Sequence, residues 1–161
     1  MISYDHEAGS RKAVDSMGYR IRQYRDGDFP QLSGLLTEVY QSPVDQETLE
    51  THYLSDSHFI ILAEQEETGR IAGCTFIERK QDYIRPGVIL YVTYVAVSEA
   101  CRKQGIGKAL LAEVERMCHD LGATAIELTS ANFRTAAHAF YESIGYTKKK
   151  TTVFIKEIPQ E

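Results

Sequence analysis

The sequence predicts an α/β fold: one domain in which a mixed β-sheet has helices on both faces. Short runs of aromatic and β-branched residues, typical of strands, alternate with longer segments whose apolar residues recur every three or four positions, typical of helices. Three strand-like runs follow one another over residues 59–97, which predicts an antiparallel meander. A helical pattern over 107–121 then separates two strand patterns, and such a connection places its two strands parallel.

The expected order is strand, two helices, three strands, helix, strand, helix and strand. The first helix is expected to begin after Asp28, with Asp28 as its N-cap and Pro30 in its first turn. The strands are expected at 19–24, 59–63, 71–78, 88–97, 125–129 and 151–158, and the later helices at 45–54, 107–121 and 132–144. Residues 1–17 are polar and aperiodic, so they predict a loose N-terminal lead-in to a single domain over 18–161.

Composition narrows the function classes. A chain of 161 residues, 43% of them hydrophobic, suits one globular domain, and a net charge of −5 argues against nucleic acid as the main partner. No apolar run approaches the roughly 20 residues that span a membrane, and the N-terminus has no signal-peptide pattern. Cys74, Cys101 and Cys118 have neither disulfide nor metal-site spacing. We therefore expect a cytoplasmic protein with reduced thiols and no metal.

The most informative stretch is a glycine turn between a buried strand and a helix. Arg102 to Lys108 reads RKQGIGK, and it follows the most apolar strand pattern in the chain. Glycine lets bare backbone approach a ligand, and a helix N-terminus presents unpaired N–H groups, so this turn predicts a pyrophosphate site. The alternative is that the glycines serve only tight packing. Neither the Rossmann nor the Walker spacing fits, since Ala109 follows Gly107-Lys108 where a Walker motif has Ser or Thr.

Three segments together resemble a known family. Residues 91–111 carry a strand followed by Arg-x-x-Gly-x-Gly, and residues 126–146 carry a strand and a helix that ends in Phe-Tyr-x-x-x-Gly-Tyr. With the strand and helix over 21–40, they resemble the GNAT superfamily of acetyl-CoA-dependent N-acetyltransferases across roughly 19–158. The resemblance implies an acyl-CoA N-acyltransferase fold, acetyl-CoA as co-substrate, and a homodimer as one state to expect.

The resemblance also implies where the donor lies. In the family, the pyrophosphate of CoA rests on the glycine turn, and the pantetheine arm pairs with the strand before it, where that strand and the next splay apart. Asn132, nine residues before Tyr141, matches a further CoA contact only loosely because many relatives have a shorter gap. The implied donor contacts are Val95, Ala96, Val97, Arg102, Lys103, Gln104, Gly105, Ile106, Gly107, Lys108 and Asn132.

For the chemistry, the resemblance points to Tyr141 as the general acid that protonates the departing thiolate. The alternative is that Tyr141 is only a core aromatic on a helix face. The base is open, because the matching strand positions hold Tyr91 and Thr93, which cannot accept a proton at neutral pH. Glu78 and Glu127 are the nearest acidic candidates, and a chain of waters is equally plausible.

The predicted reaction is direct transfer of the acetyl group, through a tetrahedral intermediate, to a primary amine. A small molecule is favoured as acceptor because the chain has no additional peptide-binding module. A protein amine, an acyl-CoA sensor without turnover and a nucleotide-binding regulatory domain are the alternatives. An acceptor pocket is expected among the tyrosines at positions 40, 53, 83, 91 and 94.

Overall fold

The structure is a computed structural model that describes residues 18–53, 55–84 and 86–159. The expected lead-in over 1–17 lies outside these residues, as do the side chains of His52 and Tyr53. The chain divides into two compact units, Met1–Thr129 and Ser130–Glu161, and each is described in turn.

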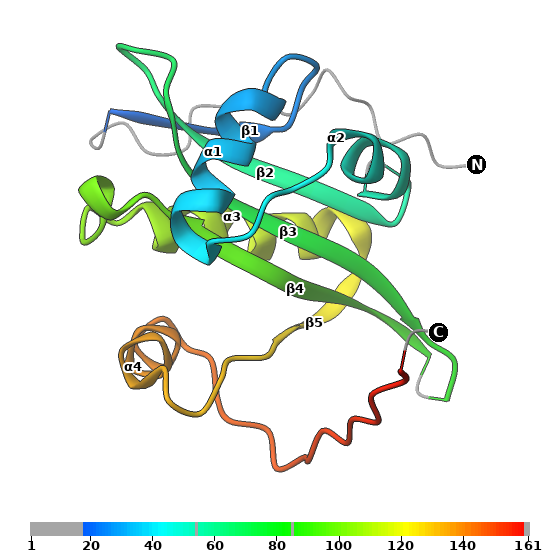
Figure 1. The fold of residues 1–161 in the computed structure, drawn as a ribbon. Coiled ribbons are helices and arrows are strands. Elements are labelled where there is room, and N and C mark those ends of the chain that lie inside the picture. Colours follow the sequence, from blue (N-terminus) through cyan, green and yellow to red (C-terminus); the bar gives the residue numbers. More distant parts are fainter. Residues whose placement is uncertain (1–17, 54, 85, 160–161) are drawn as a thin grey trace. The chain divides into compact units, whose positions relative to one another are not determined.

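The first unit is built on a five-stranded sheet (Figure 1). Its strands lie side by side in chain order, the first three pairings are antiparallel, and β4 and β5 are parallel. The predicted fold class, a mixed sheet with a meander and one parallel step, is therefore confirmed. The strands are β1 (Tyr19–Gln23), β2 (His58–Gln65), β3 (Ile71–Asp82), β4 (Gly87–Val97) and β5 (Ala123–Leu128).

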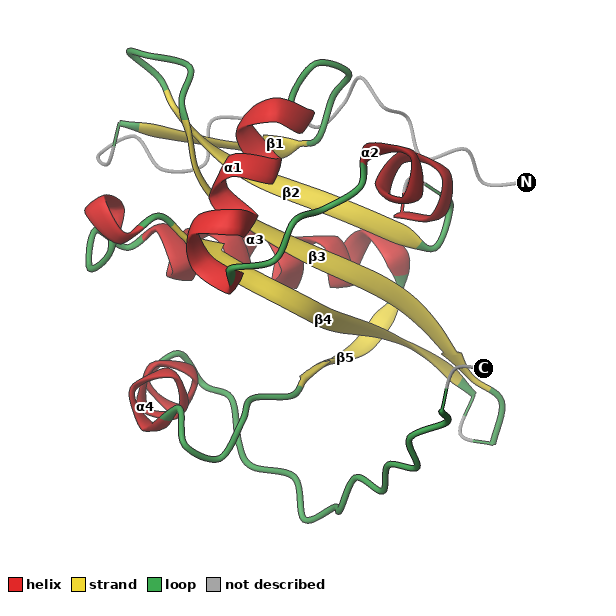
Figure 2. Cartoon of the chain, viewed as in Figure 1, coloured by secondary structure: helices red, strands yellow, loops and turns green. Residues whose placement is uncertain are grey.

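Helices cover both faces of this sheet, as Figures 1 and 2 show. Helix α1 (Phe29–Tyr40) and the short α2 (Gln46–Thr48), which continues as a π-helical turn over Leu49–Tyr53, lie on one face. Helix α3 (Ile106–Leu121), preceded by a 3₁₀ turn over Glu99–Cys101, lies on the other. Most of the apolar stripe expected on each long helix is buried, while Val39, Tyr40 and Leu121 at the helix ends are half-buried. The buried members are Leu32, Leu35 and Leu36 in α1, and Ala109, Leu110, Val114, Met117 and Cys118 in α3.

The start of α1 differs from the expectation. Asp28 makes no side-chain cap to the helix. Its carboxylate instead accepts two hydrogen bonds from the Arg22 guanidinium, at 2.6 and 2.8 Å, and one from the Arg25 backbone N–H. Arg22 also pairs with Glu64, and all three charged residues are buried. A buried guanidinium without a paired carboxylate costs more free energy than a missing N-cap, so Asp28 pairs with Arg22 rather than with the helix.

Gly73 allows α3 to approach the sheet closely. A Cβ atom at this position would lie 2.8 Å from the Ile106 side chain, 3.1 Å from the Ala96 carbonyl oxygen and 3.2 Å from the Leu110 side chain. Any other residue would push the first turn of α3 away from β3 and β4. The packing of α3 therefore depends on a glycine in a neighbouring strand.

The second unit contains one helix, α4 (Thr135–Ser143). The strand expected at 151–158 is not formed: the described residues 146–159 contain neither helix nor strand. Val153, Phe154 and Ile155 are 78%, 92% and 85% exposed. A run of apolar residues favours extended backbone, but a strand exists only where a neighbouring strand accepts its hydrogen bonds.

Candidate functional site

The second half of β4 has an open edge. β5 pairs with Val88–Val92 alone, so among the described residues no strand borders β4 from Thr93 to Val97 on that side. On the other side, Tyr94 pairs with Phe76 while Val92 pairs with Ile77, which leaves Thr93 as the extra residue of a β-bulge. The pairing of these two strands stops where β5 ends, at Leu128 opposite Val92, which is the region where the family resemblance predicts that they splay apart.

Along β4, the backbone N–H and C=O groups of successive residues point alternately toward β3 and toward the open edge. The Ser98 N–H donates to the Ala72 carbonyl at 2.9 Å, and hydrogen-bonded and non-hydrogen-bonded pairs alternate in an antiparallel ladder. Val95 and Val97 therefore turn their N–H and C=O groups away from β3, toward the open edge, whereas those of Ala96 point to β3. The edge can thus pair with a ligand that carries amides along its length.

The glycine turn lies directly after this edge. Lys103 and Gly105 have φ angles of 62° and 82°, and the Ala109 N–H makes the first bond of α3, to the Gly105 carbonyl at 2.9 Å. The N–H groups of Ile106, Gly107 and Lys108 thus have no acceptor within the helix. Gly107 adds no side chain beside them, and the exposed Arg102, Lys103 and Lys108 add positive charge. These residues fit a pyrophosphate.

Helix α1 and strand β1 brace the turn. The Glu38 carboxylate accepts the Glu99 N–H at 2.7 Å and the Ser98 hydroxyl at 3.1 Å. The bond from Glu99 lowers the pKa of Glu38, so this carboxylate is ionised at neutral pH. On the other side, the Tyr19 hydroxyl donates to Gln104 Oε1 at 2.9 Å. The conformation of the turn is thereby fixed from two distant parts of the chain.

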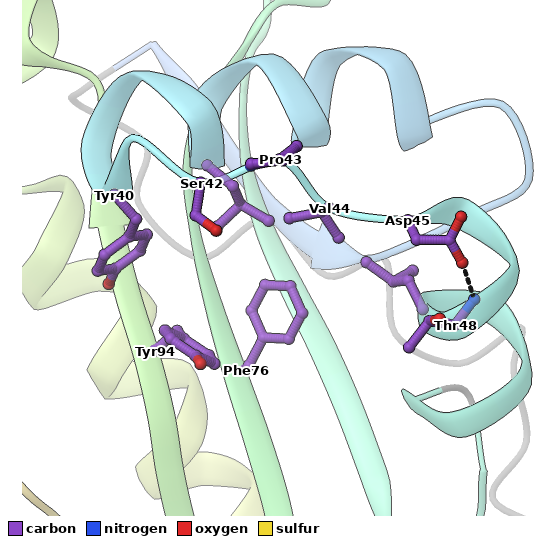
Figure 3. A pocket seen from close by; sticks show the side chains of 10 residues that line it. Tyr40, Ser42, Pro43, Val44, Asp45, Thr48, Phe76 and Tyr94 are labelled. Atoms are coloured by element: carbon purple, nitrogen blue, oxygen red, sulfur yellow. Dashed lines mark hydrogen bonds between the residues drawn. The ribbon is translucent and has the colours of Figure 1, made fainter. Parts of the chain in front are cut away.

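A cavity of about 290 Å³ lies between α1, α2, β3 and β4. Figure 3 shows Tyr40 and Tyr94 on one side of it, Asp45 and Thr48 on the other, and Phe76 between them. The Tyr40 hydroxyl donates to the Val95 carbonyl at 2.8 Å, so the cavity adjoins the open edge of β4. The lining residues are Leu36, Tyr40, Ser42, Pro43, Val44, Asp45, Thr48, Leu49, Phe76 and Tyr94.

Two of the five tyrosines that were expected around an acceptor pocket line this cavity. Tyr40 and Tyr94 line the cavity, and the Tyr94 ring packs edge-on against Tyr40 and Phe76 with centroid distances of 5.4 and 5.8 Å. Tyr91 is not among the lining residues, and Tyr83 is 89% exposed. The side chain of Tyr53 lies outside the described part of the chain.

The two candidate bases lie on either side of Tyr91. The register places Glu78 of β3 opposite Tyr91, and Tyr91 opposite Glu127 of β5, so the three residues form a row on one face of the sheet. This is the face that carries Phe76, because Phe76 and Glu78 are two residues apart on β3. The Lys80 ammonium lies 3.6 Å from the Glu78 carboxylate and 3.8 Å from the centre of the Tyr91 ring.

Tyr141 and Asn132 belong to the second unit. Asn132 lies in a turn before α4, and Tyr141 lies within α4, with its ring centroid 5.3 Å from Phe140 and 5.9 Å from Tyr146. Burial raises the pKa of the Tyr141 phenol, which the positive charge of Arg134 opposes. Tyr141 is therefore protonated at neutral pH, as a proton donor must be.

Several contributors to the site were missed by the sequence analysis. Glu38, Gly73 and the bulge at Thr93 act through contacts between segments far apart in the chain, and no local pattern announces them. Asp45 could have been predicted as an N-cap, because aspartate is a preferred residue at a helix start. Its carboxylate accepts the Thr48 N–H at 2.7 Å.

No group of three or more His, Cys, Asp or Glu residues suited to a metal occurs among the described residues. In the same part of the chain, none of the helices has the length and apolar character needed to cross a membrane.

The first unit thus combines an unpaired edge of β4 with a glycine turn at the start of a helix. Comparison with known proteins gives the family: residues 19–146 match the model of the acetyltransferase (GNAT) family. The chain belongs to this family, and it is an acyltransferase.

Relatives agree with this assignment. Glucosamine 6-phosphate N-acetyltransferase 1 of Oryza sativa subsp. japonica is 28% identical over 145 residues, which cover 84% of this chain and 85% of that protein. An aminoglycoside acetyltransferase from an uncultured soil metagenomic sample has a TM-score of 0.78 at 21% identity, covering 89% of this chain and 97% of that one. AAC(6')-Iy, solved with a bisubstrate CoA analog, has a TM-score of 0.75 at 18% identity, covering 88% and 99%.

Proposed function

We propose that this protein transfers the acetyl group of acetyl-CoA directly to the primary amine of a small molecule. The observation that carries the proposal is the continuity of two features in the first unit. The open edge of β4 at Val95 and Val97 leads, through a short braced turn, to the free N–H groups at the start of α3. An extended ligand with amides in its arm and a pyrophosphate further along matches that sequence of groups.

In this proposal each part of the donor site has one task. The N–H groups from Ile106 to Lys108, with the nearby positive charges of Arg102 and Lys103, hold the pyrophosphate. The backbone of Val95 and Val97 holds the pantetheine arm, and acetyl-CoA supplies the thioester. Two or three charge-assisted hydrogen bonds at roughly 1.5–3 kcal/mol each make the turn the main source of donor affinity.

The chemical step forms a C–N bond and breaks the C–S bond, so one proton must leave the amine and one must reach the sulfur. Tyr141 is the proposed donor to the sulfur, which its protonated state at neutral pH supports. An alkylammonium has a pKa of about 10, so a base must remove its proton before attack. Glu78 and Glu127, which flank Tyr91, are the proposed bases, and a water chain is the alternative.

A small acceptor is supported by the cavity beside the β4 edge. It is walled by α1, α2 and the sheet and open to solvent, and it has room for a compact molecule. Two of the relatives are named for small amine-bearing acceptors, a sugar phosphate and aminoglycosides.

A thermal-shift comparison tests the donor. Acetyl-CoA and CoA should raise the melting temperature at concentrations well above their Kd, whereas ATP and NADH should not. No shift with acetyl-CoA, or a larger shift with ATP, would remove the proposal and favour a nucleotide-binding regulatory domain.

A thiol-release assay across small amines and peptides tests the reaction. Release that depends on a small amine supports the proposal, and release that depends only on peptides would favour a protein acceptor. Acetyl-CoA binding without release with any amine would identify an acyl-CoA sensor.

A further inference from the structure

The cavity between α1, α2, β3 and β4 has a lining that does not suit a sugar phosphate. Among the described residues that line it, Asp45 alone carries a charge, and there is no Lys, Arg or His. A phosphate would find no positive partner here. The cavity has a volume of about 290 Å³ and is open to solvent, since half of its lining residues, Ser42, Pro43, Asp45, Thr48 and Tyr94, are exposed.

The walls of the cavity suit an alkyl chain with a positive end. The rings of Tyr40, Tyr94 and Phe76 offer aromatic faces and edges, which attract both methylene groups and ammonium ions. Leu36, Val44 and Leu49 complete the apolar surface. The net charge of −5 for the whole chain also favours the approach of a cation.

The polar groups of the cavity lie at its two ends. Figure 3 shows Asp45 on the side opposite Tyr40 and Tyr94. Tyr40 donates its hydroxyl to the Val95 carbonyl, so its end adjoins the β4 edge where the thioester is proposed to lie. Asp45 is exposed, and one oxygen of its carboxylate already accepts the Thr48 N–H. A ligand that spans the cavity would therefore have one group at this carboxylate, at the solvent-exposed rim, and its other group beside the acetyl donor.

We propose that this cavity binds a linear diamine, with one ammonium at Asp45, the methylene chain against Phe76 and the second amine presented at the β4 edge. The proposal rests on the proposed acetyltransferase function and names the substrate class of that same site. It makes Asp45 a specificity-determining residue, because Asp45 distinguishes a diamine from a monoamine of the same length.

The test compares cadaverine with pentylamine, which share one carbon chain and differ by one amine. In the thiol-release assay with acetyl-CoA, the wild-type protein should show a kcat/KM for cadaverine about two- to fivefold higher than for pentylamine, the range expected for an exposed charge pair. Glucosamine 6-phosphate should be the poorer substrate. Equal values for the two amines, or a preference for glucosamine 6-phosphate, would overturn the proposal.

Asp45→Asn removes the charge and keeps the fold. Asparagine is as good an N-cap as aspartate, so it can still accept the Thr48 N–H. The KM for cadaverine should rise about two- to fivefold with kcat unchanged, and the values for pentylamine should not change. The matched control is Glu47→Gln, which removes the same charge from the neighbouring exposed position outside the cavity and should change neither amine. Equal effects of the two substitutions would mean that Asp45 acts only through net charge.

Direct binding separates this proposal from the proposed function. Cadaverine titrated into the protein without acetyl-CoA should bind to wild type and bind more weakly to Asp45→Asn, as followed by calorimetry or NMR shifts of the aromatic rings. Binding of this kind without thiol release would refute the acetyltransferase function but not the diamine site. Thiol release with other amines and no cadaverine binding would refute the diamine site alone.

Discussion

The turn before α3 and the cavity beside α2 lie in the same unit but are built from different parts of the chain. The turn consists of seven consecutive residues, Arg102 to Lys108, and its ligand groups are backbone N–H groups at a helix start. The cavity is lined by ten side chains, eight of them from residues 36–49 and the other two, Phe76 and Tyr94, from β3 and β4. A change in the turn should therefore act on the whole donor site, whereas a change in the cavity should act through one contact at a time.

The largest effect is expected at Gly107. Gly107→Glu adds a side chain and a negative charge beside the free N–H groups of α3, where the phosphates are proposed to lie. The affinity for acetyl-CoA should fall more than about 100-fold, the loss of two charge-assisted hydrogen bonds or more, as measured by calorimetry. The matched control is Gly34→Glu on α1, where a Cβ meets nothing within 4 Å. Equal losses in the two variants would show that the fold, not the phosphate site, is affected.

Tyr141→Phe should have the next largest effect, and on a different quantity. Without the phenolic proton the departing thiolate has no acid, so kcat should fall by about 100-fold or more while the Kd for acetyl-CoA stays within about twofold. Stopped assays of thiol release and a parallel binding titration give the two values. Tyr83→Phe, at an exposed tyrosine, is the control. Wild-type turnover in Tyr141→Phe would show that Tyr141 is not the general acid and only packs against its neighbours.

The same difference explains how much the sequence could predict. The glycine turn is local, so its residue types and their order are enough to predict a helix start there, and the structure has Gly105 as the N-cap of α3. The sheet order also follows from local patterns, since a meander and one strand–helix–strand connection leave few arrangements. Element boundaries were predicted within a few residues for most strands and helices.

The parts that failed depend on partners. Asp28 was expected to cap α1, but the buried Arg22 guanidinium takes its carboxylate. Residues 151–158 were expected to be a strand, but no described strand bonds with them. The composition of the cavity is of the same kind, because Asp45 and Phe76 come together only through the fold. No pattern within either segment carries that information.

The next smaller effect is expected at Gly73, where a substitution should lower the stability of the protein by disturbing the packing of α3. Gly73→Ala places a Cβ 2.8 Å from the Ile106 side chain in the first turn of α3. Overpacking of this kind costs about 1–3 kcal/mol of unfolding free energy, measured by urea denaturation. The control is Gly34→Ala, in open space on α1, which should be neutral or add up to about 1 kcal/mol. The Gly73 variant should also bind acetyl-CoA more weakly, because it displaces the start of α3; unchanged stability would contradict the close packing.

The smallest effect is expected at Tyr40, where the two regions meet. Its ring lines the cavity, and its hydroxyl donates to the Val95 carbonyl at the open edge of β4. Tyr40→Phe keeps the ring and removes the hydrogen bond, so stability should fall by about 0.5–1.5 kcal/mol. Because the bond positions the edge beside the cavity, the KM for the amine and for acetyl-CoA should both rise about two- to fivefold, as a shift of less than 1 kcal/mol at each would give.

The control is Tyr91→Phe. It removes a hydroxyl that pairs only with the Thr129 side chain among the contacts described, and it should leave the KM for acetyl-CoA unchanged. A rise in one KM alone after Tyr40→Phe would show that the edge and the cavity act independently.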